Sequence, residues 1–251
     1  MQIAIISDIH GNDVALDAVL ADLERHAVDR VVCLGDAVQG GPQPAQVVSR
    51  LRALGCPVVM GNADAWLISG QDSGREPISP ERQARMDVVR EWMLSCLTPG
   101  DRAFIADFQP TVTIETGVGP RLLCFHGSPA SFDDVILPTT PEDAFQRLLG
   151  GYGGSILTGG HTHLQQVRRL GDYFFFNPGS VGLAYSHQQE DEAAFRVDPW
   201  AEYAVLSAEP GRLGLDFRRV SFDVAELLRA YRAGGHPFGA EAPAQYGVLP
   251  D

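Results

Sequence analysis

Three short, mostly apolar runs near the start of the chain predict strands and each end in a polar motif, and this alternation constrains the fold more than any other feature. The runs are residues 3–6, 30–34 and 57–60, and the motifs that follow them are Asp8-Ile9-His10, Gly35-Asp36 and Gly61-Asn62. Apolar residues at helical spacing lie between the runs, in segments 13–26 and 44–54. This order of strands and helices predicts a partly parallel α/β sheet with the polar motifs gathered at one edge.

The rest of the chain predicts helices first and then β-strands. Residues 64–108 predict helices, with Ser79 and Thr98 as caps, and their place in the chain suggests a cap-like segment over the site. Further strands are predicted at 110–116, 121–125, 155–158, 165–170, 173–176, 203–207 and 213–220, with helices starting at Thr140 and Asp223. The Gly-, Pro- and Ala-rich residues 235–251 predict an irregular tail. We therefore expect one domain over residues 1–251, built as a two-sheet sandwich with helices outside.

Seven side chains with metal-binding atoms lie where a predicted strand ends. They are Asp8, His10, Asp36, Asn62, His126, His161 and His163. Carboxylate, amide and imidazole ligands without thiolate favour divalent Mn, Fe, Zn, Ni or Co. Because this set is too large for one ion, it predicts a site for two divalent metal ions.

The ordered motifs resemble those of the calcineurin-like metallophosphoesterase superfamily. The resemblance runs from Asp8 to about Ser180 through Asp-x-His, Gly-Asp, Gly-Asn, His and Gly-His-x-His. It implies a four-layer αββα sandwich of two mixed β-sheets flanked by helices. It also implies a metal-dependent phosphoric ester hydrolase, a phosphodiesterase or phosphatase, in which a hydroxide bridging two metal ions attacks phosphorus.

The resemblance also implies a role for each ligand. Asp8, His10 and His163 would hold the first metal, Asn62, His126 and His161 the second, and Asp36 would bridge both. Asp36, Asn62 and His126 are expected to take part in catalysis as well as in metal binding.

The Gly-Asn motif continues with Ala63 and Asp64, which departs from part of the superfamily. In many phosphomonoesterases of the superfamily a histidine follows the asparagine and protonates the leaving oxygen. The Gly-Asn-x-Asp variant instead resembles small prokaryotic phosphodiesterase-like relatives, which favours a small phosphodiester or activated phosphate ester as substrate. With Ala63 in place of histidine, we expect leaving-group protonation to be unnecessary or done by water, with Asp64 supporting catalysis from behind the ligands.

Several polar residues outside the ligand set have simpler interpretations. Asn177-Pro178-Gly179-Ser180 resembles a segment that follows the last ligands in small prokaryotic members, and its expected role is structural support. His26 and His236 are expected to be solvated. His187 lies in segment 183–199, which is either an exposed turn or a mobile loop near the site, and the sequence favours the turn.

Composition limits the partners and the location of the protein. The chain of 251 residues is 45% hydrophobic, with net charge -13 and pI about 4.8. This acidity argues against tight binding to nucleic acid or to an anionic membrane, but two metal ions would still attract a small phosphorylated substrate. Neither a signal peptide nor a membrane span is apparent, so we expect a cytoplasmic protein. The four cysteines form no Cys-x-x-Cys pair and predict small buried hydrophobes.

Two alternatives to the small-ester hydrolase stay open at the level of the sequence. The same site also suits a nucleotide pyrophosphatase or a protein phosphatase. A non-catalytic interaction module on the same fold is a different class, as in a retromer subunit that resembles the superfamily but has an incomplete metal set. The complete ligand set in this chain counts against the interaction module.

Overall fold

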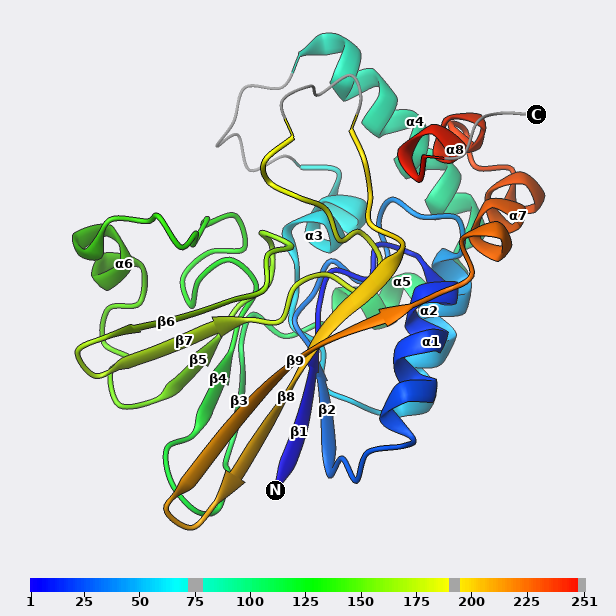
Figure 1. The fold of residues 1–251 in the computed structure, drawn as a ribbon. Helices are drawn as coiled ribbons and strands as arrows, with labels where there is room; N and C mark the ends of the chain where they lie inside the picture. Colours follow the sequence, from blue (N-terminus) through cyan, green and yellow to red (C-terminus); the bar gives the residue numbers. More distant parts are fainter. Residues whose placement is uncertain (72–78, 190–194, 248–251) are drawn as a thin grey trace.

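Two mixed β-sheets pack face to face, and helices cover their outer faces (Figure 1). The computed structural model describes residues 1–71, 79–189 and 195–247. Its arrangement is the αββα sandwich expected from the sequence. Three clusters of buried apolar residues lie between the successive layers. No helix in the described ranges is long and apolar enough to cross a membrane.

The first sheet has the strand order β2-β1-β8-β9. Its strands are β1 (Gln2–Ile6), β2 (Arg30–Cys33), β8 (Trp200–Glu209) and β9 (Arg212–Ser221). β1 pairs with β2 in parallel and with β8 in antiparallel orientation. Ala4 and Ile6 pack with residues of α1 (Asp13–Leu23) and α2 (Pro44–Leu54), whereas Ile3 and Ile5 pack between the sheets. The apolar run 3–6 of β1 is needed because both faces of this part of the strand are buried.

The second sheet has the strand order β3-β4-β5-β7-β6. Its strands are β3 (Val112–Ile114), β4 (Leu122–Cys124), β5 (Ile156–Thr158), β6 (Gln166–Leu170) and β7 (Tyr173–Asn177). Leu122 and Cys124 face the first sheet, while Leu123 packs outward with Phe145 of α6 (Glu142–Leu148). The parallel strands β4, β5 and β7 therefore end at the same edge.

Three helices follow the first βαβ units: α3 (Asn62–Ser69), α4 (Pro80–Cys96) and α5 (Pro99–Ala106). The Ser79 and Thr98 side chains accept backbone N–H bonds as N-caps, as the sequence predicted. Within the expected cap-like segment, α4 lies beside the C-terminal helices, but α5 packs on α2 and α3 in the helix layer (Figure 1). Residues 72–78 of that segment lie outside the described ranges.

Two predicted elements differ from those observed. The expected strand at 57–60 is reduced to isolated bridges, with Val58 beside Cys33 and Val59 beside Gln109. It is short because the chain turns at Gly61 directly into α3. The expected irregular tail is wrong for residues 239–245, which form a 3-10 turn (Gly239–Glu241) and α8 (Ala242–Gln245) after α7 (Val224–Gly234). Residues 248–251 lie outside the described ranges.

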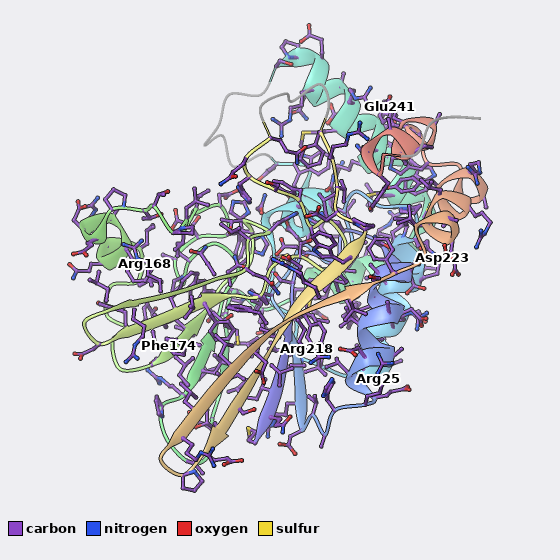
Figure 2. All side chains as sticks on the ribbon, viewed as in Figure 1. Arg25, Arg168, Phe174, Arg218, Asp223 and Glu241 are labelled. Atoms are coloured by element: carbon purple, nitrogen blue, oxygen red, sulfur yellow. The ribbon has the colours of Figure 1, made fainter. Side chains whose placement is uncertain are left out.

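A buried carboxylate, Asp22, joins α1 to the first sheet. It accepts hydrogen bonds from Arg25 Nη2 at 2.7 Å, Tyr203 Oη at 2.6 Å and Arg218 Nε at 2.9 Å. Figure 2 marks Arg25 just beyond α1 and Arg218 on β9. Both oxygens of this carboxylate are therefore occupied by donors from the protein.

Candidate metal centre

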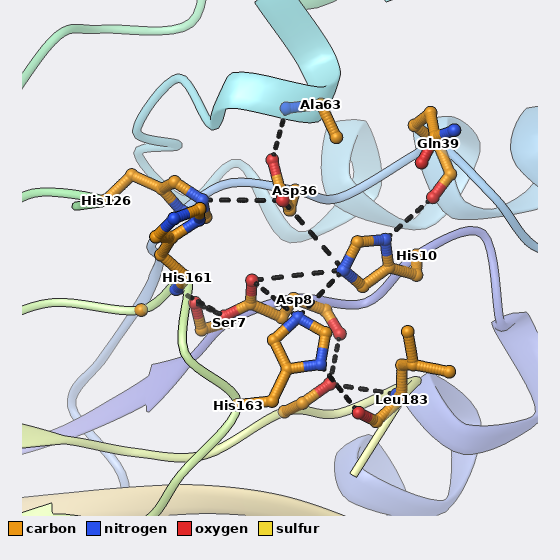
Figure 3. Close-up of polar contacts among 12 residues, drawn as sticks. Ser7, Asp8, His10, Asp36, Gln39, Ala63, His126, His161, His163 and Leu183 are labelled. Atoms are coloured by element: carbon orange, nitrogen blue, oxygen red, sulfur yellow. Dashed lines mark hydrogen bonds and ion pairs between the residues drawn. The ribbon is translucent and has the colours of Figure 1, made fainter. Parts of the chain in front are cut away.

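The ends of the strands bring all seven predicted ligands together. Asp8 and His10 follow β1, Asp36 follows β2, Asn62 begins α3, His126 follows β4, and His161 and His163 follow β5. Figure 3 shows six of these side chains converging between the loops, with Ala63 beside Asp36. The gathering at one edge results from the two parallel strand pairs, because parallel strands end on the same side.

Two clusters of donor atoms form within this edge. Asp8, His10 and His163 make one cluster, and Asp36, His126 and His161 make the other, with the ligand atoms of each cluster within 4.8 Å of one another. The Asn62 Oδ1 atom lies 3.0 Å from His126 Nε2, which adds an amide oxygen to the second cluster. Asp8, His10 and His163 thus lie in one group and Asn62, His126 and His161 in the other, and metal binding by each group stays a prediction.

Asp36 lies between the clusters. Its Oδ2 atom is 3.4 Å from His126 Nε2 and 3.9 Å from His10 Nε2, so it faces one histidine of each group. Its Oδ1 atom accepts the backbone N–H of Ala63 at 2.8 Å. One carboxylate oxygen is thus held by α3 and the other is directed to both clusters, as a bridging ligand requires.

Backbone carbonyl groups fix the orientation of three histidine rings. The Nδ1 atoms of His10, His126 and His163 lie 2.8, 2.8 and 2.7 Å from backbone carbonyl oxygens. An imidazole that donates from Nδ1 to a carbonyl presents Nε2 as its metal-binding atom. The ring nitrogens His10 Nε2 and His163 Nε2 are 3.1 Å apart, close to the separation of about 3 Å expected for two ligands at about 2 Å from one ion.

The Asp8 carboxylate provides a direct test of whether a cation fits. Its Oδ2 accepts from Ser7 Oγ at 2.5 Å and from the His161 backbone N–H at 3.1 Å. Its Oδ1 is buried and has no hydrogen-bond donor in the described part of the chain, and it lies 3.3 Å from His163 Nε2. A buried carboxylate oxygen without a donor is costly unless a cation or ion-pair partner compensates it. The donor set therefore fits divalent metal ions.

The charges of the candidate centre are paired in the same pattern. Burial disfavours ionised Asp36, but the adjacent His126 outweighs that effect and lowers the pKa of Asp36. Burial also opposes protonation of His126, yet Asp36 raises its pKa to about 10. Asp8 has its pKa lowered against burial by His163, whose own pKa is raised by Asp8. Each carboxylate thus stabilises a protonated histidine beside it. A bound metal ion would supply that positive charge instead.

Backbone strain is concentrated at the predicted ligands. In the described ranges, the non-glycine residues with positive φ are Asp8, His10, Asp36, His161 and His163, with φ between 47° and 68°. Each such conformation costs on the order of 1–3 kcal/mol, and it persists only where the surrounding structure enforces it. Here the strained turns re-aim the side chains from the strand direction into the space between the clusters.

Two motif glycines are required by close packing against these carboxylates. A Cβ at Gly61 would overlap Asp36, and a Cβ at Gly160 would overlap Ser7 Oγ and lie 2.7 Å from Asp8 Oδ2. The glycines of the Gly-Asn and Gly-His-x-His motifs therefore leave room for the ligands of neighbouring loops.

Asp64 lies behind the ligands and supports their loop. Its two carboxylate oxygens accept the backbone N–H groups of Ala37 at 3.0 Å and Val38 at 3.1 Å, directly after Asp36. Burial, with the Asp36 charge as the next cause, raises the pKa of Asp64 to about 7. Asp64 is fully buried, so its contacts are those of a positioning residue.

The segment after β7 also supports the centre. The Asn177 side chain donates to Gly160 O at 2.6 Å, and Ser180 Oγ donates to Asp8 O at 2.7 Å. These contacts fit the supporting role expected for residues 177–180. In the 183–199 segment, the Leu183 carbonyl lies 2.7 Å from His163 Nδ1. His187 is exposed, yet its ring nitrogen lies 2.6 Å from Thr162 O, while residues 190–194 lie outside the described ranges.

A cavity of about 530 Å³ adjoins His10, and the sequence did not predict it. It is lined by residues of α4 and of the C-terminal segment that was expected to be irregular. His236 is half-buried in its wall instead of solvated, with its Nε2 3.0 Å from Gly40 O. The signal that was available for it is a set of aromatic residues, Phe238 and Tyr246 in the Gly- and Pro-rich tail and Tyr231 just before it.

Comparison with known proteins identifies the family. The chain matches the calcineurin-like phosphoesterase superfamily domain over residues 1–198, and it belongs to that family. It is 25% identical over 193 residues to phosphodiesterase YfcE from Escherichia coli, covering 73% of this chain and 80% of the relative. The expectation of a phosphoric ester hydrolase is thus confirmed at the level of the family.

Two further relatives cover most of the chain. An uncharacterised protein of Methanocaldococcus jannaschii, MJ0912, is 28% identical over 183 residues, which cover 72% of this chain and 70% of the relative. The crystal structure of a metallophosphoesterase from Sphaerobacter thermophilus is 25% identical, with a TM-score of 0.70 and coverage of 98% of this chain and 99% of that chain. This last similarity extends beyond residue 198, so it includes the C-terminal helices.

Proposed function

We propose that the protein is a binuclear metal-dependent phosphoesterase that hydrolyses a small phosphodiester or phosphate ester. The observation that carries the proposal is the pair of donor clusters with the Oδ2 atom of Asp36 facing both. Two divalent ions at such a site supply an activated water and positive charge for the phosphoryl oxygens. The proposed cofactors are two ions of Mn, Fe, Zn, Ni or Co, and the proposed partner is a small phosphorylated substrate.

The residues of the chain act by holding and orienting. Asp8, His10 and His163 hold one ion, Asn62, His126 and His161 the other, and Asp36 binds both. The carbonyl groups behind the histidines fix their Nε2 atoms, so the ligands need little reorganisation on binding. His126 and Asn62 would take part in catalysis by holding the ion that stabilises charge on the phosphoryl oxygens.

Ala63 supports a preference for esters with a good leaving group. It follows Asn62 at the start of α3, and its backbone N–H is used by Asp36 Oδ1. Its methyl side chain has no proton to give to the leaving oxygen. Hydrolysis of an ester with an acidic leaving group does not need that proton.

Metal reconstitution tests the proposal. The metal-free protein is loaded separately with each of the five candidate ions, and the ion content is measured by elemental analysis. We expect two ions per chain, and hydrolysis of bis(p-nitrophenyl) phosphate that chelation abolishes and metal restores. A fully folded protein that binds metal but hydrolyses no phosphate ester would refute the enzyme and favour an interaction module.

A further inference from the structure

The cavity beside His10 lies between α4 and the C-terminal helices, and we name it the tail pocket. Its walls include Arg82 and Arg85 of α4, together with aromatic residues from segments 195–198 and 231–246. Its inner end is formed by His10 and by residues of the loops that surround it, including Gly40 and Leu183. In Figure 2, Glu241 of the tail lies beside α4 at the top of the molecule. The tail pocket therefore adjoins the candidate metal centre at His10.

Hydrogen bonds fix the tail pocket relative to that centre. The His236 Nε2 atom lies 3.0 Å from Gly40 O, and the preceding carbonyl, that of Gln39, lies 2.8 Å from His10 Nδ1. The same loop thus orients a metal ligand and fixes the tail. The His236 ring also packs edge-on against Trp92 and Tyr231, with ring centroids 4.9 and 5.1 Å apart.

Four aromatic side chains border the tail pocket. Phe195, Tyr231, Phe238 and Tyr246 are all half-buried and border the cavity, so part of each ring surface is accessible from it. Aromatic side chains stack favourably on planar rings, including those of nucleobases, without requiring a specific hydrogen-bond pattern. A volume of about 530 Å³ lies within the range of small-molecule sites.

The charges on the wall favour an anionic molecule. Arg82 and Arg85 both line the tail pocket, against one acidic lining residue, Glu241. Arg85 donates to Glu241 Oε2 at 2.7 Å, and its guanidinium group lies 3.7 Å from the centre of the Phe238 ring. The wall therefore carries an excess of one positive charge in a chain whose net charge is -13. Guanidinium groups are well suited to pair with phosphate oxygens.

We propose that the tail pocket binds a planar aromatic group of the substrate, a nucleobase or an aryl ring, while the ester phosphate lies at the candidate metal centre. The substrate class is then an aromatic or nucleoside phosphoester, which rests on the phosphoesterase function proposed above. The aromatic faces bind the ring. The positive charges of the arginines attract the anionic ligand towards the site.

Matched pairs of ligands test this assignment. Calorimetry on the metal-reconstituted protein compares adenosine 5′-monophosphate with ribose 5-phosphate, and phenyl phosphate with methyl phosphate, with chromatography to verify that each ligand stays intact. Within a pair the phosphate is the same and only the ring differs. We expect the ring-bearing ligand to bind about tenfold more tightly in at least one pair. The pair with the larger ratio distinguishes a nucleobase from an aryl ring.

Substitutions then locate the ring. Phe195→Leu and Phe238→Leu each keep an apolar side chain but remove a planar face, and we expect the ratio to fall several-fold in both. Phe217→Leu is the matched control, because Phe217 is 37% exposed on β9 and does not line the tail pocket. Thermal unfolding verifies that each variant folds, and either pocket variant suffices for the test.

The outcomes separate this inference from the proposed function. Equal dissociation constants within both pairs, or a ring preference that both pocket variants retain, would overturn the tail pocket assignment. Failure of the phosphoesterase function would be seen differently, as the absence of hydrolysis of every ester by protein that carries two ions. Ester hydrolysis without any ring preference would overturn only the assignment of the tail pocket as a site for an aromatic ring.

Discussion

The buried carboxylates of two regions of this molecule have different surroundings. Asp22, between α1 and the first sheet, accepts hydrogen bonds on both oxygens from Arg25, Tyr203 and Arg218. At the candidate metal centre, one oxygen of Asp8 and one of Asp36 are held by protein donors, while the other oxygen of each lies 3.3–3.4 Å from a histidine nitrogen. A carboxylate that stabilises the fold is satisfied by the fold, whereas one that binds a ligand keeps an oxygen available. Replacing an aspartate by asparagine in each region distinguishes a carboxylate that stabilises the fold from one that binds a ligand.

The largest effect is expected for Asp36→Asn. An amide at the bridging position weakens binding of both ions, so kcat/KM for bis(p-nitrophenyl) phosphate should fall at least about 1000-fold, or about 4 kcal/mol. Metal addition should raise the melting temperature of the wild type and should raise that of this variant much less. Asp143→Asn, at an exposed site on α6, is the matched control and should behave as wild type. Full activity in Asp36→Asn would exclude the bridging role.

Gly160→Ala tests whether the position of Asp8 matters as much as its charge. The added methyl group would overlap Ser7 Oγ and displace the Asp8 carboxylate. Small displacements of catalytic groups cost about 100-fold in rate, and we expect a loss of that size in kcat/KM. Gly119→Ala is the control, since its Cβ would meet no atom within 4 Å. Equal activity in the two variants would mean that the centre tolerates movement of Asp8.

Asp22→Asn should lower the stability of the protein and leave its activity unchanged, the reverse of what is expected at the metal centre. We expect a loss of about 2 kcal/mol in the free energy of unfolding, because charge-assisted hydrogen bonds from a tyrosine and two arginines are weakened. Activity and metal content should be retained at temperatures where the variant is folded. Urea unfolding measures the first quantity and the hydrolysis assay the second. A large loss of activity in the folded variant would show that the two regions are coupled.

The pH dependence of stability sharpens the same test. Burial opposes ionisation of Asp22, but hydrogen bonds from Tyr203, Arg218 and Arg25 outweigh it and lower its pKa well below the ordinary value of 3.8. A lowered folded-state pKa stabilises the protein fully above the unfolded value and loses this contribution as the pH falls. The stability difference between wild type and Asp22→Asn should therefore be largest near neutral pH and shrink below about pH 4. Urea unfolding at pH 7 and at pH 3 measures it.

The smallest expected effect is an increase in kcat, in the variant Ala63→His. A histidine after Asn62 places a proton donor where the leaving oxygen departs, and kcat for phenyl phosphate should rise about tenfold, below the range of an optimised general acid. p-Nitrophenyl phosphate, whose leaving group needs no proton, should gain less. Ala63→Gln matches the added bulk without a titratable group. A gain of equal size in both variants would show that size, and not proton donation, limits the monoester reaction.

Much of the candidate centre was predictable because its residues follow strands that the sequence marks clearly. The runs before Asp8 and Asp36 are apolar apart from Arg30, and the turn after each carries a motif whose order identifies the family. Asn12 and Gly55 mark the start of α1 and the end of α2 as their residue types predict. Local chemistry therefore determined these elements and the residues at their ends.

The tail was mispredicted for an equally physical reason. Its Gly and Pro content gives little helical preference, and residues 239–245 are helical while the tail packs on α4 and on the Gly40 loop. His236 has a polar side chain with no local signal of burial, and its partner Gly40 is 196 residues away in the chain. Contacts between residues far apart in the chain override a weak local helical preference. They cannot be predicted from residues that are neighbours in the sequence.

The sequence by itself determined the class of fold, the family and the identity of the seven candidate ligands, because each depends on local patterns and their order. Only the tertiary structure decided which oxygen of each carboxylate is held and which is available, how five ligands adopt strained turns, and that α4 and the tail enclose a cavity beside His10. These properties arise from distances between segments far apart in the chain, and packing alone sets those distances.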